Sequence, residues 1–168
     1  MIKGLHHNAY RCRDSEETRR FYEDFLGLPL VHTLKIEETI TGRNTGTGVL
    51  HTFFQLDDGS CLAFFEAPDM PFEWKAQHDF DLHIALEVEP PVLREMMAKG
   101  KALGIETRGI SDHGFVHSIY FRDPNGYVIE LTAKMPEHAT MMDPGTNDAR
   151  TILDRWQAEK ARGSPSAG

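Results

Sequence analysis

Two histidines and one glutamate stand at matching places in two similar halves of the chain. His7 opens the first strand-like segment of one half, and His83 opens the corresponding segment of the other. Glu130 follows a late glycine by four residues in the second half, where the first half has Ala63. Two imidazoles and one carboxylate leave positions open on a divalent metal, which suits ferrous oxygen chemistry. The sequence therefore predicts a metal site with three protein ligands.

The strand patterns turn two of these side chains toward the same side. Residues 82–88 alternate, with His83 opposite the apolar face that carries Ile84, and Glu130 lies opposite Ile129 in the same way. A buried carboxylate without a partner would become protonated or destabilise the fold, so a metal or cation beside Glu130 is physically reasonable. The ordinary alternative is that the histidines are polar residues at strand starts and Glu130 is a solvated acid. Three matched positions favour the metal.

Each half shows the order strand, helix and three strands. The helix of the first half begins at Asp14 or Ser15 and ends at Gly27, and a polar loop over 37–48 follows the next strand. The predicted strands are 5–13, 28–35, 49–56 and 60–66 in the first half, and 82–88, 105–109, 115–122 and 127–133 in the second. A helix over 90–103 belongs to the second half, residues 67–81 connect the halves, a helix covers 147–161 and the tail 163–168 is expected to be disordered.

Repeats of this kind pair to cover a shared cavity. We therefore expect an α+β fold in which two βαβββ modules form a cupped mixed sheet around a metal cavity, with a C-terminal helix. The expected domain covers 1–135, with modules over about 4–67 and 82–134. Residues 136–168 form a C-terminal extension.

Bulk composition narrows the class of protein. The 168 residues fit one domain, and 40% hydrophobic and 26% charged content is ordinary for a globular chain. A net charge of -8 argues against a nucleic-acid partner. No apolar run is long enough to span a membrane, and the N-terminus lacks the apolar core of a signal peptide. Cys12 and Cys61 have no CxxC spacing, so we expect no disulfide and a cytoplasmic location.

The opening motifs resemble the vicinal oxygen chelate superfamily, which includes glyoxalase I, methylmalonyl-CoA epimerase, fosfomycin and bleomycin resistance proteins and type I extradiol dioxygenases. The resemblance covers about residues 4–134. It implies that His7, His83 and Glu130 are the metal ligands. The segments that carry it are Gly4-Leu5-His6-His7 with Asp14, Phe21-Tyr22 and Leu26-Gly27-Leu28.

The stretch from His113 to Glu130 is most similar to the extradiol dioxygenases. It contains His113, the pair Ile119-Tyr120, then Asp123-Pro124-Asn125-Gly126 and Glu130. The resemblance implies that His113 and Tyr120 are catalytic residues that contact the substrate without binding the metal. It further implies Fe²⁺ as cofactor, with Mn²⁺ or another divalent metal as alternatives, and a dioxygenase that uses O₂ on a catecholic or related small aromatic substrate in aromatic compound catabolism.

Two departures keep other functions open. Glyoxalase I needs a fourth metal ligand late in the first repeat. In this chain, aligning the two repeats without a gap places Ala63 at that position, and a slip in the alignment would place Glu66 there. The acid–base histidine of the extradiol enzymes is replaced by Ser60, unless His51 or His78 supplies that function. The alternatives are a glyoxalase- or epimerase-type lyase or isomerase, and a non-catalytic resistance-type binding protein.

An apolar stripe on the C-terminal helix needs a surface to cover it. Ile152, Leu153 and Trp156 share one side of this helix, and burying each side chain contributes about 1.5–3 kcal/mol. The surface is either the chain's own body or a partner. Because the superfamily often builds cavities or packing across two chains, we expect a homodimer. Alternation should also send one phenylalanine of Phe53-Phe54 and one of Phe64-Phe65 toward the cavity.

Overall fold

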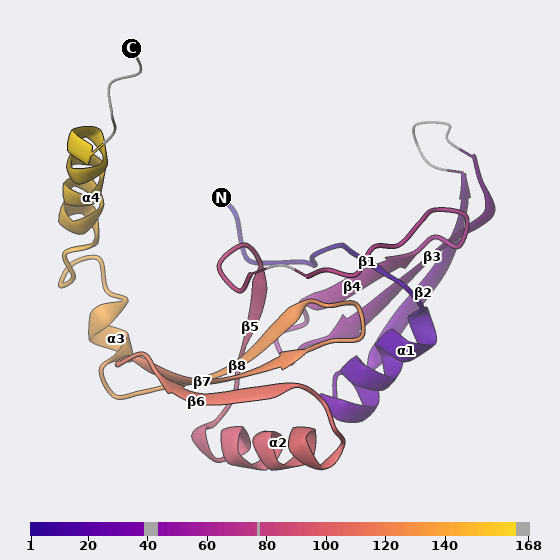
Figure 1. Ribbon diagram of the computed structural model, residues 1–168, viewed down its shortest axis with the longest axis horizontal. Helices are drawn as coiled ribbons and strands as arrows, with labels where there is room; N and C mark the ends of the chain where they lie inside the picture. The colour runs from indigo at the N-terminus through magenta and orange to yellow at the C-terminus, as the bar shows by residue number, and fades with distance from the viewer. Residues whose placement is uncertain (39–43, 77, 164–168) are drawn as a thin grey trace. The chain divides into compact units, whose positions relative to one another are not determined.

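The computed structural model describes residues 1–38, 44–76 and 78–163 (Figure 1). The chain divides into two compact units, one made of 1–84 with 120–130 and the other of 85–119 with 131–168. The division cuts across the two modules, and the predicted domain limits stay a prediction. Among the described residues, no helix is long and apolar enough to cross a membrane.

Two successive series of strand, helix and three strands confirm the predicted α+β fold (Figure 1). The first series consists of β1 (Tyr10–Cys12), α1 (Ser15–Arg19), the π-helical η1 (Arg20–Phe25), β2 (Leu30–Glu38), β3 (Asn44–Gln55) and β4 (Cys61–Glu66). The second consists of β5 (His83–Glu87), α2 (Pro90–Ala102), β6 (Thr107–Asp112), β7 (Val116–Arg122) and β8 (Val128–Lys134). The short α3 (His138–Met141) and α4 (Ala149–Gly163) follow.

Each series forms a four-stranded sheet with the same arrangement. The strand orders are β1-β4-β3-β2 and β5-β8-β7-β6. In the first sheet β1 and β4 are parallel, whereas β4 with β3 and β3 with β2 are antiparallel. The first and last strands of each series therefore lie side by side, which is why residues at strand starts can meet residues of the last strand.

Three sequence expectations differ from the structure. The predicted strand 5–13 is regular only over Tyr10–Cys12, and His7 forms an isolated parallel bridge with Cys61. The predicted loop 37–48 is wrong at both of its ends, because β2 and β3 stay paired as far as Glu38 and Asn44. Residues 39–43 lie outside the described residues. Cross-strand hydrogen bonding here overrides the local preference of Gly and Thr for loops. The helix α3 was not predicted, and most of the predicted tail, 164–168, is not described.

The first helix begins as its sequence predicts. The Asp14 side chain accepts a hydrogen bond from the backbone N–H of Glu17 at 2.8 Å, and acidic residues occupy the first turn. The segment ends before Gly27, whose φ of 84° is left-handed. Its buried side is formed by Phe21, Tyr22 and Phe25.

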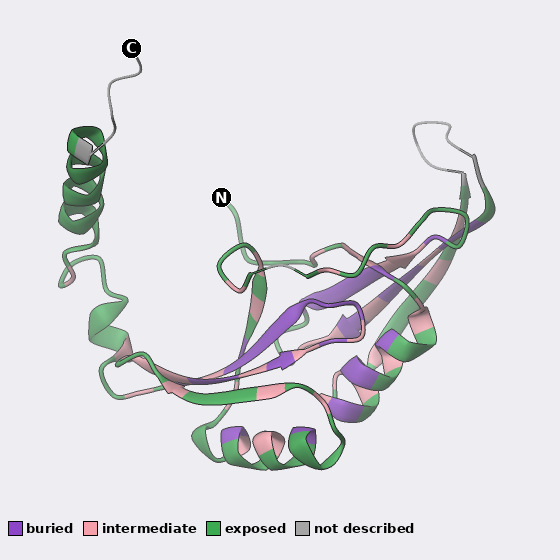
Figure 2. Cartoon of the chain, in the orientation of Figure 1, coloured by how far each residue is buried: buried purple, intermediate pink, exposed green. Residues whose placement is uncertain are grey.

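These rings pack on one face of the first sheet. Phe54 and Phe64 are fully buried against Tyr22, with ring centroids 5.5 and 4.7 Å away. Figure 2 shows buried residues along β4 and β8, on part of β3 and on one side of the first helix. Phe53 and Phe65 alternate onto the opposite face and are half-buried. The expected division of each phenylalanine pair is therefore observed.

A polar cluster lies inside this core. Asp123 is 1% exposed, and its carboxylate accepts from the Tyr22 hydroxyl at 3.0 Å, from the Asn125 side chain and from the backbone N–H groups of Asn125 and Tyr127. Burial raises the pKa of Asp123, and these donors act in the opposite direction. The Asp123-Pro124-Asn125-Gly126 turn is thus fastened to the first helix by a hydrogen-bonded carboxylate.

Replacing Tyr22 by phenylalanine is expected to lower the free energy of unfolding by about 1.5–3 kcal/mol, because a buried acid loses a donor while the ring contacts stay. Tyr127→Phe is the matched control. Its hydroxyl donates to the neutral carbonyl of Arg11 at 3.0 Å, so its expected loss is about 0.5–1.5 kcal/mol. Urea unfolding of both variants measures the difference, and an equal or reversed order would contradict the proposed strength of the Asp123 cluster.

The second unit has its own hydrogen bonds. Val88 N–H donates to the Thr132 carbonyl at 2.9 Å, and Ser118 donates to the Thr132 hydroxyl at 3.1 Å. Helix α4 forms as predicted, but its stripe stays uncovered in this single chain. Ile152, Leu153 and Trp156 are 60%, 47% and 57% exposed. Whether the chain's own body or a partner covers the stripe stays open, and the homodimer stays a prediction.

Candidate metal and substrate site

Strands β5 and β8 bring two of the predicted ligands together within the first unit. The Nε2 atom of His83 lies 3.2 Å from Oε2 of Glu130. Glu130 is only 7% exposed, whereas 41% of the His83 side chain is exposed. A buried carboxylate that faces an imidazole is a donor pair suited to a divalent cation.

A hydrogen bond fixes the orientation of the His83 ring. Its Nδ1 atom lies 2.7 Å from the carbonyl oxygen of Asp79, which can only accept a proton. The Nδ1 atom therefore carries a proton, and Nε2 is the ring nitrogen that faces Glu130 and could bind a metal. Asp79 in turn forms a 4.0 Å ion pair with Arg122, whose guanidinium donates to the Gly126 carbonyl at 2.8 Å.

Tyr120 lies on the other side of the same carboxylate. Its hydroxyl is 3.5 Å from Oε1 of Glu130, a long hydrogen bond. The sequence predicts that Tyr120 stands beside a metal ligand without binding the metal, and this role stays a prediction. The Glu130 carboxylate thus lies between an imidazole nitrogen and a phenolic O–H.

His7 lies among aromatic rings on the first sheet. Its Nδ1 is 2.7 Å from Nδ1 of His6, and its ring centroid is 5.4 Å from Phe53 and 6.0 Å from His51. His51 is buried, is bonded through Nδ1 to the Phe64 carbonyl at 2.9 Å and stacks on Phe65 at 3.7 Å. Burial lowers the pKa of His51. This cluster of aromatic and imidazole rings was not predicted, because no spacing motif connects His7 with β3.

The three predicted ligands do not meet in one chain. Over residues 1–38, 44–76 and 78–163, no three His, Cys, Asp or Glu side chains form a group that could hold a metal ion. The His83–Glu130 pair fits a divalent metal by its chemistry, and His7 does not complete it here. The ligand set His7, His83 and Glu130 stays a prediction.

Glu66 is engaged elsewhere. Its carboxylate accepts from the backbone N–H of Ser15 at 2.8 Å and thereby binds the start of the first helix. Alternation along β4 places Ala63 and Phe65 on the opposite face, where Phe65 stacks on His51. The geometry favours Ala63 over Glu66 at the position that a fourth ligand would take.

The remaining predicted residues belong to the second unit or have other partners. His113 is exposed in the loop between β6 and β7, within the second unit, and its backbone N–H donates to Val116. Ser60 donates to Asp58 at 2.6 Å in the β3–β4 turn. His78 accepts from the Phe80 backbone at 3.1 Å. The roles predicted for His113 and Tyr120 stay predictions.

Comparison with known proteins identifies the relatives of the fold. A profile described as the Glyoxalase/Bleomycin resistance protein/Dioxygenase superfamily matches residues 4–131. No curated protein matches the sequence.

Solved structures match over most of the chain at low identity. The fosfomycin resistance protein FosX from Listeria monocytogenes, complexed with Mn(II) and sulfate, is 22% identical with a TM-score of 0.61, over 83% of this chain and 98% of that one. FosX from Mesorhizobium loti is 22% identical with a TM-score of 0.58, over 83% of this chain and 98% of that one. A glyoxylase/bleomycin resistance protein/dioxygenase domain from Frankia sp. EAN1pec is 16% identical with a TM-score of 0.63, over 80% of this chain and 100% of that one. At these identities the matches show the fold alone.

Proposed function

We propose that this chain, which belongs to the Glyoxalase/Bleomycin resistance protein/Dioxygenase superfamily, is a divalent-metal enzyme that oxygenates a catecholic or related small aromatic substrate. One observation carries the proposal: the buried Glu130 carboxylate faces Nε2 of His83 on one side and the Tyr120 hydroxyl on the other. A metal bound by this pair would supply Lewis acidity and a template for two adjacent substrate oxygens.

The proposed ligands are His83 and Glu130 of one copy and His7 of a second copy. Superfamily members are commonly dimers that act on small molecules. One chain does not bring His7 to the His83–Glu130 pair. A second copy that supplies its own His7 would complete the three ligands that the sequence predicts. We favour Fe²⁺ from the ligand types, and Mn²⁺ is the alternative that the Listeria relative contains.

The chain's own residues handle protons and orientation. The Asp79 carbonyl keeps the His83 proton on Nδ1, and the Tyr120 hydroxyl is placed to donate to an oxygen beside Glu130. The half-buried Phe53 and Phe65 offer ring faces on the sheet side that carries His7 and His51. Planar aromatic substrates stack well on such rings. His113 is proposed to reach the substrate from its exposed loop.

A second candidate is metal-dependent modification of a small phosphonate such as fosfomycin. Its support is the fold shared with two FosX proteins, one of them complexed with Mn(II). The four-ligand isomerase reading is less favoured, because Glu66 is hydrogen-bonded to the first helix.

Oxygen consumption tests the proposal. Protein prepared without oxygen and loaded with Fe²⁺ or Mn²⁺ is expected to consume O₂ with at least one member of a catechol panel. The Glu130→Gln variant should be inactive at equal folded content. If the protein binds metal stoichiometrically and consumes fosfomycin but takes up no O₂, the dioxygenase proposal is rejected and the second candidate is supported.

A further inference from the structure

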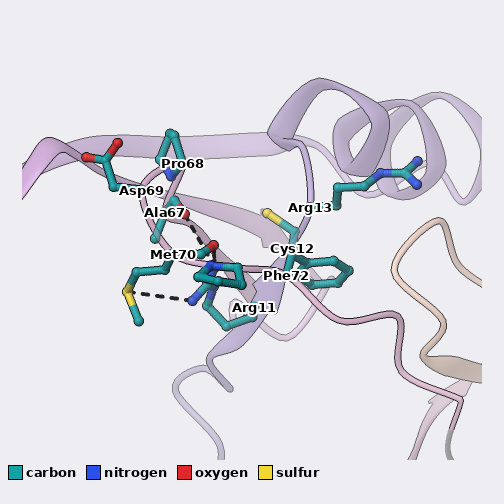
Figure 3. Close-up of a pocket in the computed structure, with 9 residues that line it drawn as sticks. Arg11, Cys12, Arg13, Ala67, Pro68, Asp69, Met70 and Phe72 are labelled. Atoms are coloured by element: carbon teal, nitrogen blue, oxygen red, sulfur yellow. Dashed lines mark hydrogen bonds between the residues drawn. The ribbon is translucent and has the colours of Figure 1, made fainter.

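A pocket of about 400 Å³ lies beside β1, between that strand and the segment that follows β4. Arg11 contributes its guanidinium, and Ala67, Met70 and Phe72 contribute walls (Figure 3). Nothing in the proposed metal chemistry uses this pocket. All of its residues belong to the first unit.

The guanidinium of Arg11 is poorly satisfied. It has five N–H donors. Nη2 donates to the carbonyls of Met70 at 3.2 Å and Ala67 at 3.4 Å. Among the residues that the structure describes, Nη1 contacts only the Met70 sulfur, at 3.8 Å. Nε is buried without a hydrogen-bond partner. Sulfur is a weak acceptor, so three of the donors lack an oxygen.

The positive charge of Arg11 is also uncompensated. Within the described part of the chain, no carboxylate lies within ion-pair distance of this guanidinium. The nearby acids are engaged elsewhere: Asp69 accepts from Thr47, and Glu66 accepts from Ser15. Burial raises the pKa of the Cys12 thiol to about 11, so the thiol stays neutral and supplies no negative charge. A half-buried cation of this kind is normally paired.

We propose that this pocket binds a small organic anion through Arg11, with a carboxylate or phosphate group as the recognised part. A planar guanidinium binds both kinds of oxyanion in a bidentate way. The Met70 side chain, which is half exposed, swings aside and its sulfur is replaced on Nη1 by a ligand oxygen. Pro68 and Phe72 contact the apolar part of the ligand.

Arg13 supplies a matched control. It lines the same pocket, but its guanidinium points toward the first helix and pairs with Glu17 (Figure 3). Arg11→Met should abolish anion binding, and Arg13→Gln should leave it unchanged. Arg11→Lys keeps the charge and loses the bidentate fork, so binding should weaken by about tenfold.

The experiment is an NMR titration of the full-length protein with inorganic phosphate and, separately, with acetate. The expected result is a saturable shift of the backbone N–H signals of the pocket residues, which every variant retains, with one or both anions. Comparing the two titrations also tells phosphate from carboxylate recognition. The readout needs neither metal nor turnover, so it is separate from the proposed function. The proposal is overturned if neither anion gives saturation, if folded Arg11→Lys binds as wild type does, or if Arg13→Gln abolishes the effect.

Discussion

Replacing His83 by alanine is expected to reduce bound Mn²⁺ to background, which corresponds to a loss of metal affinity of ~100-fold or more. Substituting a residue that only orients a metal ligand already lowers metal affinity by about 10–100-fold, so removing a ligand should have a larger effect. The variant removes the Nε2 atom that faces Glu130 at 3.2 Å. Because the His83 side chain is 41% exposed, the fold should persist. Metal analysis after dialysis, with circular dichroism, measures both effects. His32→Ala is the control, since His32 is exposed and outside the ligand set. Full occupancy in His83→Ala would refute the assignment.

The same variant tests whether the site is shared between two copies. His7→Ala and His83→Ala chains, each without metal binding, are mixed after mild unfolding and refolded together. If ligands come from two copies, about a quarter of the wild-type metal content should return, because about half of the dimers are mixed and each mixed dimer has one intact site of two. A site built within one chain would recover nothing. The doubly substituted chain, mixed with either single variant, should also recover none.

Most of the fold could be predicted because its signals are local. The Asp14 cap, the stripe of Phe21, Tyr22 and Phe25 and the alternation in β4 each specify an element without reference to distant residues. The predicted loop at 37–48 was wrong because strand pairing is a long-range effect. Glu38 pairs with Asn44 across a segment whose Gly and Thr content favours a loop.

The candidate site could be predicted only in part, for a related reason. The side of the strand on which His83 and Glu130 lie follows from alternation, and the structure places them 3.2 Å apart. The motif around Tyr120 predicts a catalytic role for it, and that role stays a prediction. The contacts of His51 and the engagement of Glu66 by Ser15 depend on tertiary packing, which leaves no spacing pattern in the sequence. In the proposed assembly, His7 would meet the other two ligands across a surface outside the single chain, which no local sequence pattern describes.

Replacing Tyr120 by phenylalanine is expected to lower turnover by roughly 10²–10⁴-fold while the metal stays bound. The hydroxyl lies 3.5 Å from Glu130, so its hydrogen bond is long and contributes little to stability. Loss of the O–H should therefore act on proton transfer and leave KM and the midpoint of unfolding nearly unchanged. A fall in kcat at constant metal content is the measured signature.

The control for this prediction is Tyr127→Phe, which removes a hydroxyl from the same hairpin. That hydroxyl donates to the Arg11 carbonyl, so its loss should reduce stability slightly and leave kcat unchanged. His113→Ala extends the test to the second predicted catalytic residue. A similar loss of kcat there would mean that the exposed loop reaches the substrate during turnover. Unchanged kcat in both Tyr120→Phe and His113→Ala would show that the extradiol-like motif has no catalytic role in this chain.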